Sequence, residues 1–305
     1  MDDELIQFKG VTKRFGKNVV LNSIDLTIPE GKITGIIGAS GEGKSTILKM
    51  MASFYKPNKG KIYYRKKNIL HDRKILSKLL GFAIEDGSFY EKLNVEENLF
   101  HFGRLYNVKK SVLKKRVEEI ISLIGLENAK KTLAEDLSLG MKKRLDVGCS
   151  LVHNPGILIL DEPTADLDPL LRRQMMNLIK QINSHGTTVI LTTQLLEEAE
   201  EICDRVAILF NEKIIIEGSP LSINKKYDSK NLDEVFNKIF SRKERKTYQE
   251  SSDEKTKLNL PNKKLELKKT LITDKNKLDD LIEKSKSRDD AEEYLEEVKG
   301  GKNVD

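Results

Sequence analysis

Residues 38–46 combine glycines, one lysine and hydroxyl groups at a spacing suited to holding phosphate groups. Glycines let the backbone curl so that successive N–H groups point at phosphate oxygens. A lysine in such a loop neutralises phosphate charge, and a hydroxyl ligates Mg²⁺. The segment fits the pattern G-x-x-x-x-G-K-[ST] in full. It therefore predicts a binding loop for ATP and Mg²⁺, formed by Gly38, Ala39, Ser40, Gly41, Glu42, Gly43, Lys44, Ser45 and Thr46.

A second set of chemical groups, Asp161 and Glu162, comes directly after the apolar residues 157–160. A buried strand of this kind delivers both carboxylates to the edge of a sheet. We expect Asp161 to hold Mg²⁺, directly or through water, and Glu162 to polarise the water that attacks the γ-phosphate. Together with the loop at 38–46, the acidic pair predicts a P-loop nucleoside triphosphatase.

The segments around these groups alternate between strand and helix. Apolar residues 33–37 precede the loop as a buried strand, and residues 45–54 follow with apolar side chains at helical spacing. Strands are also expected at 5–11, 19–28, 187–192 and 205–210, and helices across 91–135 and at 170–184. This order predicts an α/β fold with a largely parallel sheet and helices on its faces.

The composition limits the class of protein. The 305 residues are 38% hydrophobic, enough for one or two domains with a core, and the formal net charge is +6. This charge fits a solvated surface, with docking near an anionic membrane or weak nucleic-acid contact as alternatives. Cys149 and Cys203 are far apart, which argues for a reducing compartment. No window approaches the roughly 20 apolar residues of a membrane-spanning helix, so another chain must supply any span.

The segment 137–145 reads Leu-Ser-Leu-Gly-Met-Lys-Lys-Arg-Leu and lies a short helix upstream of the acidic strand. It resembles the L-S-G-G-Q signature of ABC ATPases, in a variant similar to the drug- and sodium-export branch with its daunorubicin-resistance-type members. The resemblance implies a P-loop α/β fold of ABC type, with a mostly parallel core sheet, an N-terminal antiparallel β-subdomain and an inserted α-helical subdomain at about 91–150. It also implies that Ser138 and Gly140 close over the γ-phosphate held by another subunit. A helix dipole suits an anion there, and Ser138 also suits a plain helix cap.

Four further positions match or depart from the ABC pattern. Phe15 resembles the aromatic residue that stacks on adenine, and Asp168 resembles the aspartate that crosses the dimer interface. Glu85 stands where most of the family carries glutamine, and its oxygens are expected to reach Mg²⁺ or the attacking water. Gln194 stands where most members carry histidine. Its amide can donate to the γ-phosphate but shuttles no proton, so slower hydrolysis is expected.

The resemblance covers residues 1–219, which we interpret as the ABC ATPase domain. Apolar side chains at helical spacing over 232–240 predict a short docking helix within 220–240. About half of the residues from 241 onward are charged, and such a segment buries too little apolar surface to offset its ordering entropy. Residues 241–305 are therefore expected to form a charged tail that is partly disordered or weakly helical, and that serves as a docking arm, a membrane-surface arm or neither.

The ordered set of motifs predicts the ATP-hydrolysing subunit of an ABC exporter. This chain and a second copy or a paralogous ATPase subunit would sandwich two ATP–Mg²⁺ and drive separate integral-membrane permease subunits from the cytoplasmic face of the cell membrane. Glu85 and Gln194 together leave open a regulatory nucleotide-binding subunit with little turnover. A soluble ABC ATPase acting on ribosomes or DNA is a further alternative, although the chain has one cassette and no nucleic acid is expected as a partner.

Overall fold

Two β-sheets organise the chain in this computed structural model, which describes residues 4–67 and 73–239. The smaller sheet is antiparallel, with three strands in the order β2-β1-β4. Gly16 adopts a φ of 60° in the tight turn between its first two strands, a conformation that favours glycine. The expected N-terminal antiparallel subdomain is thereby confirmed. Its strands are β1 (Glu4–Phe15), β2 (Asn18–Pro29) and β4 (Lys59–Tyr64).

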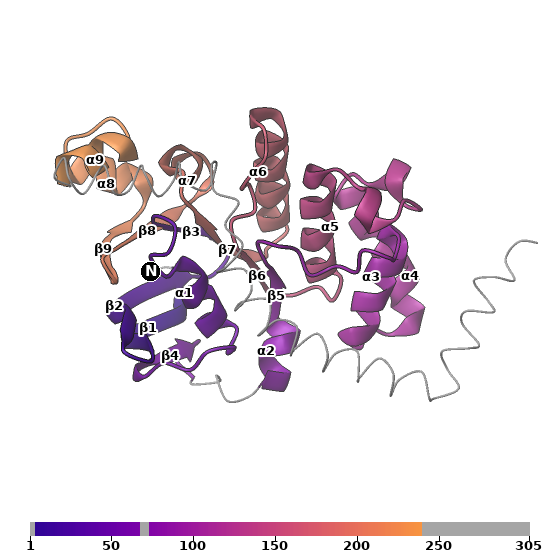
Figure 1. The fold of residues 1–305 in the computed structure, drawn as a ribbon, viewed down its shortest axis with the longest axis horizontal. Helices are drawn as coiled ribbons and strands as arrows, with labels where there is room; N and C mark the ends of the chain where they lie inside the picture. The colour runs from indigo at the N-terminus through magenta and orange to yellow at the C-terminus, as the bar shows by residue number, and fades with distance from the viewer. Residues whose placement is uncertain (1–3, 68–72, 240–305) are drawn as a thin grey trace, which may run out of the picture. The chain divides into compact units, whose positions relative to one another are not determined.

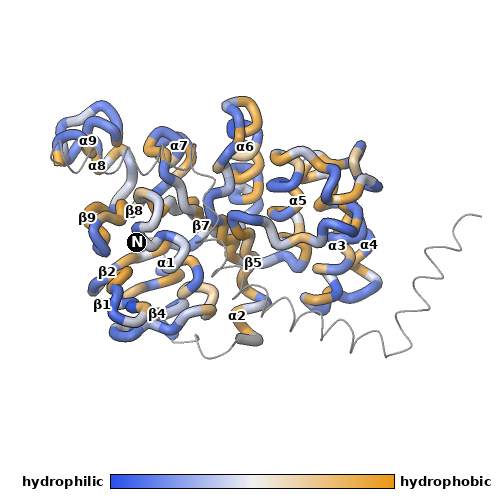
Figure 2. The backbone as a smooth tube through the Cα atoms, viewed as in Figure 1, coloured by the Kyte–Doolittle hydropathy of each residue, from blue (hydrophilic) through white to orange (hydrophobic). Residues whose placement is uncertain are grey.

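The larger sheet has six strands in the order β5-β6-β7-β3-β8-β9, and only β9 runs antiparallel to its neighbour. Every residue of β3 and β6 is buried, as expected of parallel strands covered on both faces. Figure 2 shows the hydrophobic colouring of this sheet around β5 and β6. The strands are β3 (Ile33–Ile37), β5 (Leu80–Ala83), β6 (Ile157–Leu160), β7 (Thr188–Thr193), β8 (Arg205–Phe210) and β9 (Lys213–Gly218).

Helices surround this sheet, and three of them, α3, α4 and α5, pack together as a helical group inserted between β5 and β6 (Figure 1). Helix α1 instead follows β3 directly and packs beside the smaller sheet. The α-helices are α1 (Lys44–Met51), α2 (Arg73–Leu79), α3 (Val95–Leu105), α4 (Lys110–Leu123), α5 (Leu139–Leu151), α6 (Pro169–Ser184), α7 (Leu196–Ile202), α8 (Pro220–Lys226) and α9 (Leu232–Ile239), with 3₁₀ turns at Glu127–Ala129 and Ala134–Asp136.

The starts of the helices follow local sequence signals. Asn94 and Glu97 form a reciprocal capping box at the start of α3. Ser138 caps α5, and Asp168 caps α6 with Pro169 in the first turn. The caps at Ser138 and Asp168 fix the chain direction at two residues that the sequence singles out for function.

The C-terminal part of the described chain differs in detail from the sequence-based expectation. Two helices, α8 and α9, occupy the segment where one short helix is predicted. The additional helix begins at Pro220, after Ser219 caps it, and α9 packs against both α7 and α8. Within the described ranges, no helix has the length and apolar character needed to cross a membrane. The tail predicted at 241–305 lies outside the described residues.

Candidate functional site

The loop between β3 and α1 has the backbone shape that phosphate binding requires. Gly41 and Gly43 have φ values of 86° and 106°, in the left-handed region that favours glycine. A side chain at Gly38 would place its Cβ 2.8 Å from the backbone oxygen of Leu209, so only glycine fits. Gly43 caps α1, and the N–H groups at the start of this helix are directed toward the loop. The loop therefore fits a bound phosphate chain.

Lys44 is the first residue of α1, and its ammonium group is held over the loop. Its Nζ donates to the backbone oxygens of Gly38 and Ala39, at 2.8 and 3.0 Å. The same atom lies 3.1 Å from Oε1 of Glu162, and only 4% of the Lys44 side chain is exposed. A buried ammonium that faces a glycine-rich loop is placed to meet the negative charge of a nucleotide.

Asp161, at the end of β6, accepts hydrogen bonds from a hydroxyl of the phosphate loop and from a hydroxyl of β7. Ser45 Oγ donates to its Oδ1 at 3.1 Å, and Thr192 Oγ1 donates to the same oxygen at 2.7 Å. A serine hydroxyl beside a carboxylate oxygen is the kind of donor pair that Mg²⁺ prefers. Thr192, from β7, was not singled out in the sequence, although it lies two residues before Gln194, which was.

Glu162 stands in an unusual backbone conformation at the centre of the cluster. Its φ is 48°, a region that costs a residue other than glycine about 1–3 kcal/mol. Its backbone N–H donates to Thr192 Oγ1 at 2.9 Å. Gln194 Nε2 lies 2.9 Å from each of the two carboxylate oxygens and donates to them. A buried carboxylate held in this way, on strained backbone, points to a role of the side chain in chemistry rather than in folding.

Glu42 and Glu85 each form a hydrogen bond with a segment outside this cluster, Glu42 through its side chain and Glu85 through its backbone oxygen. Burial raises the pKa of the Glu42 carboxyl, which accepts hydrogen bonds from the backbone of Asn211 and Glu212 in the β8–β9 turn. Glu42 therefore ties the phosphate loop to this turn. Glu85 follows β5 and is half-buried, and its backbone oxygen accepts a hydrogen bond from Lys143 Nζ at 2.9 Å.

Phe15 lies at the end of β1 with 43% of its surface exposed. Its ring meets Tyr55 edge-on at 5.1 Å between centroids, and Lys13 Nζ lies 4.8 Å from the ring centre. One face of the aromatic ring is thus supported by protein while the residue remains accessible to a flat ligand.

The signature residues and Asp168 are placed on α5 and α6. Ser138 is exposed, and its Oγ accepts from the N–H of Met141 at 3.4 Å. Asp168 Oδ1 accepts from two N–H groups in the first turn of α6, at 2.9 and 3.0 Å. Gly140 is buried, and a Cβ there would lie 3.1 Å from Leu171. Figure 1 shows α5, which Ser138 caps, well apart from α1, which begins at Lys44.

Glu198 forms a buried network that the sequence did not reveal. It is 6% exposed and accepts from Thr164 Oγ1 at 2.7 Å and Thr193 Oγ1 at 3.0 Å. Arg172 Nε lies 3.0 Å from its other carboxylate oxygen. The network connects the segment after Glu162 with the strand before Gln194. Because Glu198 lies in a run of four glutamates interrupted only by one alanine, its sequence gives little sign of which glutamate is buried.

The fold and this cluster together define a class of protein. A parallel sheet carries a glycine-rich loop and helix at the end of β3 and an acidic pair at the end of β6, two strands away. The cluster contains an ammonium paired with the carboxylate of Glu162 and a serine hydroxyl that donates to the carboxylate of Asp161. This is the arrangement of a P-loop nucleoside triphosphatase.

Known proteins place the chain within that class. The sequence model of the family described as ABC transporter matches residues 21–165. The linearmycin resistance ATP-binding protein LnrL of Bacillus subtilis (strain 168) is 32% identical over 215 residues, which are 70% of this chain and 69% of that protein. The daunorubicin resistance ATP-binding protein DrrA3 of Streptomyces coeruleorubidus is 31% identical over 219 residues, 72% of this chain and 69% of that protein. Among solved structures, the dimeric post-hydrolysis state of the ATP-binding cassette MJ0796 bound to ADP and Pi superposes with a TM-score of 0.64 at 28% identity, covering 70% of this chain and 98% of that chain.

The chain belongs to the ABC transporter family, as one of its ATP-hydrolysing subunits. The predicted resemblance to the drug-export branch is confirmed by these relatives, and the predicted fold is confirmed by the solved cassette.

Proposed function

We propose that this chain is the ATP-driven motor of an exporter, with residues 1–219 as its ATPase domain and about 91–150 as the helical subdomain. The observation that carries the proposal is the continuous contact from Lys44 through Glu162 to Gln194, beside the Ser45–Asp161 pair. No other grouping of the described residues combines a phosphate loop with carboxylates aimed at it. The export role is supported by relatives whose names give drug resistance.

Each group has a role that its position suggests. The backbone of the loop and Lys44 bind the phosphates, and Phe15 stacks on adenine. Ser45 and Asp161 would hold Mg²⁺, which supplies charge neutralisation at the phosphates when bound, and Glu85 is a further oxygen donor toward it. Glu162 accepts the proton of the attacking water. Because Lys44 pairs with Glu162 here, ATP must draw the ammonium toward the phosphates and release the carboxylate for this task.

We propose that a second subunit completes the site. Ser138 and Gly140 of one chain would contact the γ-phosphate bound by the other, and Asp168 would cross between them. The exposed Ser138 at the start of α5 supports this arrangement, since a helix N-terminus stabilises an anion. The dimeric state of the MJ0796 cassette is consistent with it. Integral-membrane permease subunits are the proposed partners, at the cytoplasmic face of the membrane.

Two measurements test this function. The purified full chain is expected to hydrolyse ATP with Mg²⁺ present and to lose this activity in excess EDTA, because the oxygens of Ser45 and Asp161 alone cannot neutralise the phosphates. Restoring Mg²⁺ should restore the rate. Fractionation of the source cells should then place the chain in the membrane pellet. Hydrolysis that persists without any divalent metal would contradict the assigned site, and a stable ribosome or DNA association without membrane association would contradict the exporter role.

A regulatory subunit with low turnover is a second candidate, because Gln194 donates to both oxygens of Glu162 and so restrains the proposed base. In this case Gln194→His should raise kcat about 3-fold to 10-fold, since a histidine adds a chargeable donor near the γ-phosphate. ATPase assays at saturating ATP measure the change, with Gln181→His on the exposed side of α6 as the control. An unchanged or lower rate would show that Gln194 does not limit hydrolysis, and would favour the exporter motor over the regulatory subunit.

A further inference from the structure

Four hydrogen bonds join one face of α5 to the segment 84–88, which carries Glu85. Asp146 Oδ1 accepts from the backbone N–H of Ser88 at 2.7 Å and from its hydroxyl at 2.5 Å. The Asp146 carboxyl also receives a hydrogen bond from the backbone N–H of Ile84. Lys143, almost one helical turn earlier, donates from Nζ to the backbone oxygen of Glu85 at 2.9 Å. The segment is thus held at both ends and near its middle by two side chains.

The burial of Asp146 shows that this arrangement is costly to maintain. It is 3% exposed, and its helix neighbours Leu145, Val147 and Gly148 are buried too, so an apolar residue would suit the position. Burial raises the pKa of Asp146 to about 6, although the hydrogen bonds from Ser88 and the charge of Lys143 act in the opposite direction. A carboxylate kept here in spite of burial indicates that its hydrogen bonds are needed.

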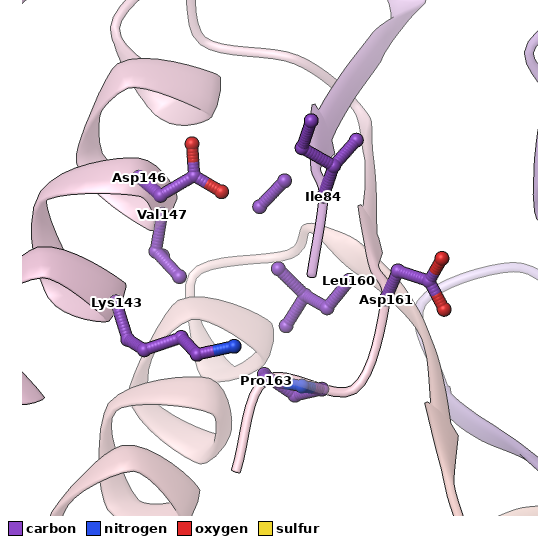
Figure 3. Close-up of a pocket in the computed structure, with 8 residues that line it drawn as sticks. Ile84, Lys143, Asp146, Val147, Leu160, Asp161 and Pro163 are labelled. Atoms are coloured by element: carbon purple, nitrogen blue, oxygen red, sulfur yellow. The ribbon is translucent and has the colours of Figure 1, made fainter. Parts of the chain in front are cut away.

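The same two side chains face the metal-binding edge of the sheet. Lys143 and Asp146 line a small pocket together with Ile84, Leu160, Asp161 and Pro163. Figure 3 shows the two residues on one helix, with Ile84 and Asp161 on the strand ends opposite. The backbone that leads from β5 to Glu85 therefore runs between α5 and the acidic end of β6.

We propose that Lys143 and Asp146 are positioning residues that fix the segment 84–88 to α5 and thereby aim Glu85 at the ATP site. The inference rests on the proposed role of Glu85 in that site. It also assigns a mechanical task to α5. Ser138 caps this helix eight residues before Asp146, so about 12 Å of continuous helix joins the signature to the contacts on Glu85. A shift of α5 caused by the partner's nucleotide would then be passed to Glu85.

Hydrogen exchange tests the attachment without relying on activity. In the full chain, Asp146→Ala and Lys143→Met are each expected to speed amide exchange at residues 84–88, while the phosphate loop keeps its unsubstituted rate. Lys180→Met, which removes a lysine from an exposed ion pair on α6, is the matched control and should leave 84–88 unchanged. Unchanged exchange at 84–88 in folded Lys143→Met and Asp146→Ala chains would overturn the inference.

A double-mutant cycle tests whether the two residues act through Glu85. Asp146→Ala should lower kcat on the order of 10-fold to 100-fold, with the Kd for ATP changed less than about twofold, because a Glu85 side chain that is no longer held in place loses catalytic alignment while the phosphate contacts remain. In a Glu85→Ala background the same change should have little further effect.

Asp146→Ala is expected to fold, because it removes the carboxylate that burial disfavours. The pKa of Asp146 is raised on folding, so its stabilising contribution is present below about pH 4 and is lost as the pH rises through about 6. At pH 7.5 the alanine variant therefore avoids the cost of burying an ionised carboxylate. If the kcat losses of the Asp146 and Glu85 substitutions multiplied in full in the double variant, the two residues would act independently, and the positioning role would be overturned. Absence of hydrolysis by the unsubstituted chain would instead contradict the proposed function. The hydrogen-exchange rates at 84–88 would still show whether Lys143 and Asp146 hold this segment to α5.

Discussion

A Glu162→Gln variant is expected to hydrolyse ATP about 100-fold or more slowly than the unsubstituted chain, while it binds ATP with similar affinity. The reason lies in what the amide cannot do. It keeps the size of the side chain and one oxygen for the Gln194 donor, but it cannot take a proton from the attacking water. It also ends the ion pair with Lys44, which lies 3.1 Å from Oε1, and so frees the ammonium for the phosphates. Binding should therefore persist when turnover stops.

The measurement combines a phosphate-release assay with size-exclusion chromatography in Mg²⁺ and ATP. The slowed variant should accumulate as an ATP-bound dimer, because the step that would reopen the proposed dimer is blocked. Glu119→Gln is the control, since Glu119 pairs with Lys115 and Arg116 on the outer surface of α4 and its loss should leave the rate unchanged. A Glu162→Gln chain that turns over ATP at the unsubstituted rate would show that another group serves as the base.

The residues of the phosphate loop and the acidic pair could be predicted from the sequence because they lie in two short continuous segments. The glycines, Lys44 and Ser45 follow one another along the chain, and Asp161 and Glu162 follow one apolar strand. Alternating strands and helices then specify a parallel sheet, whose strand ends bring the two segments together. The Ser45–Asp161 contact spans 116 residues of sequence, yet it follows from the fold class alone.

The parts that escaped prediction depend on contacts between distant residues with no motif of their own. Asp146 and Ser88 are 58 residues apart, and Asp146 reads in the sequence as one more charge on an amphipathic helix. Glu198 and Thr164 are 34 residues apart, and three other glutamates surround Glu198. Helix α8 was missed for a different reason. It has seven residues, too few for an apolar period, so only Ser219 and Pro220 signalled its start.

A Ser138→Asp variant is expected to lose ATP hydrolysis about 100-fold or more although α5 stays folded. Aspartate caps a helix as well as serine does and complements the helix dipole, so the thermal midpoint should not fall. The new carboxylate would, however, face the γ-phosphate of the proposed partner subunit. Two like charges about 4 Å apart near a protein surface repel by about 4 kcal/mol, which is enough to prevent the proposed dimer from closing over ATP.

Ser138→Asn separates this explanation from simple capping. Asparagine is an equally good cap but adds no charge. If Ser138 serves only its own helix, both variants should hydrolyse ATP like the unsubstituted chain. If it faces a phosphate, Ser138→Asn should keep most of the activity and Ser138→Asp should keep almost none. Steady-state rates at saturating ATP, with thermal unfolding as the check on folding, distinguish the two cases.

Mixing two inactive variants then shows which chain supplies the signature. Lys44→Met removes the ammonium from the phosphate loop but leaves Ser138 intact, and the Ser138→Asp variant has the opposite defect. In a mixed dimer one site would combine the intact loop of one chain with the intact signature of the other. Random pairing makes half of the dimers mixed, each with one intact site, so the mixture should recover up to roughly a quarter of the unsubstituted rate. Each variant alone should stay inactive. If both halves of the site came from the same chain, no mixture could recover activity, because every chain carries a defect in its own site.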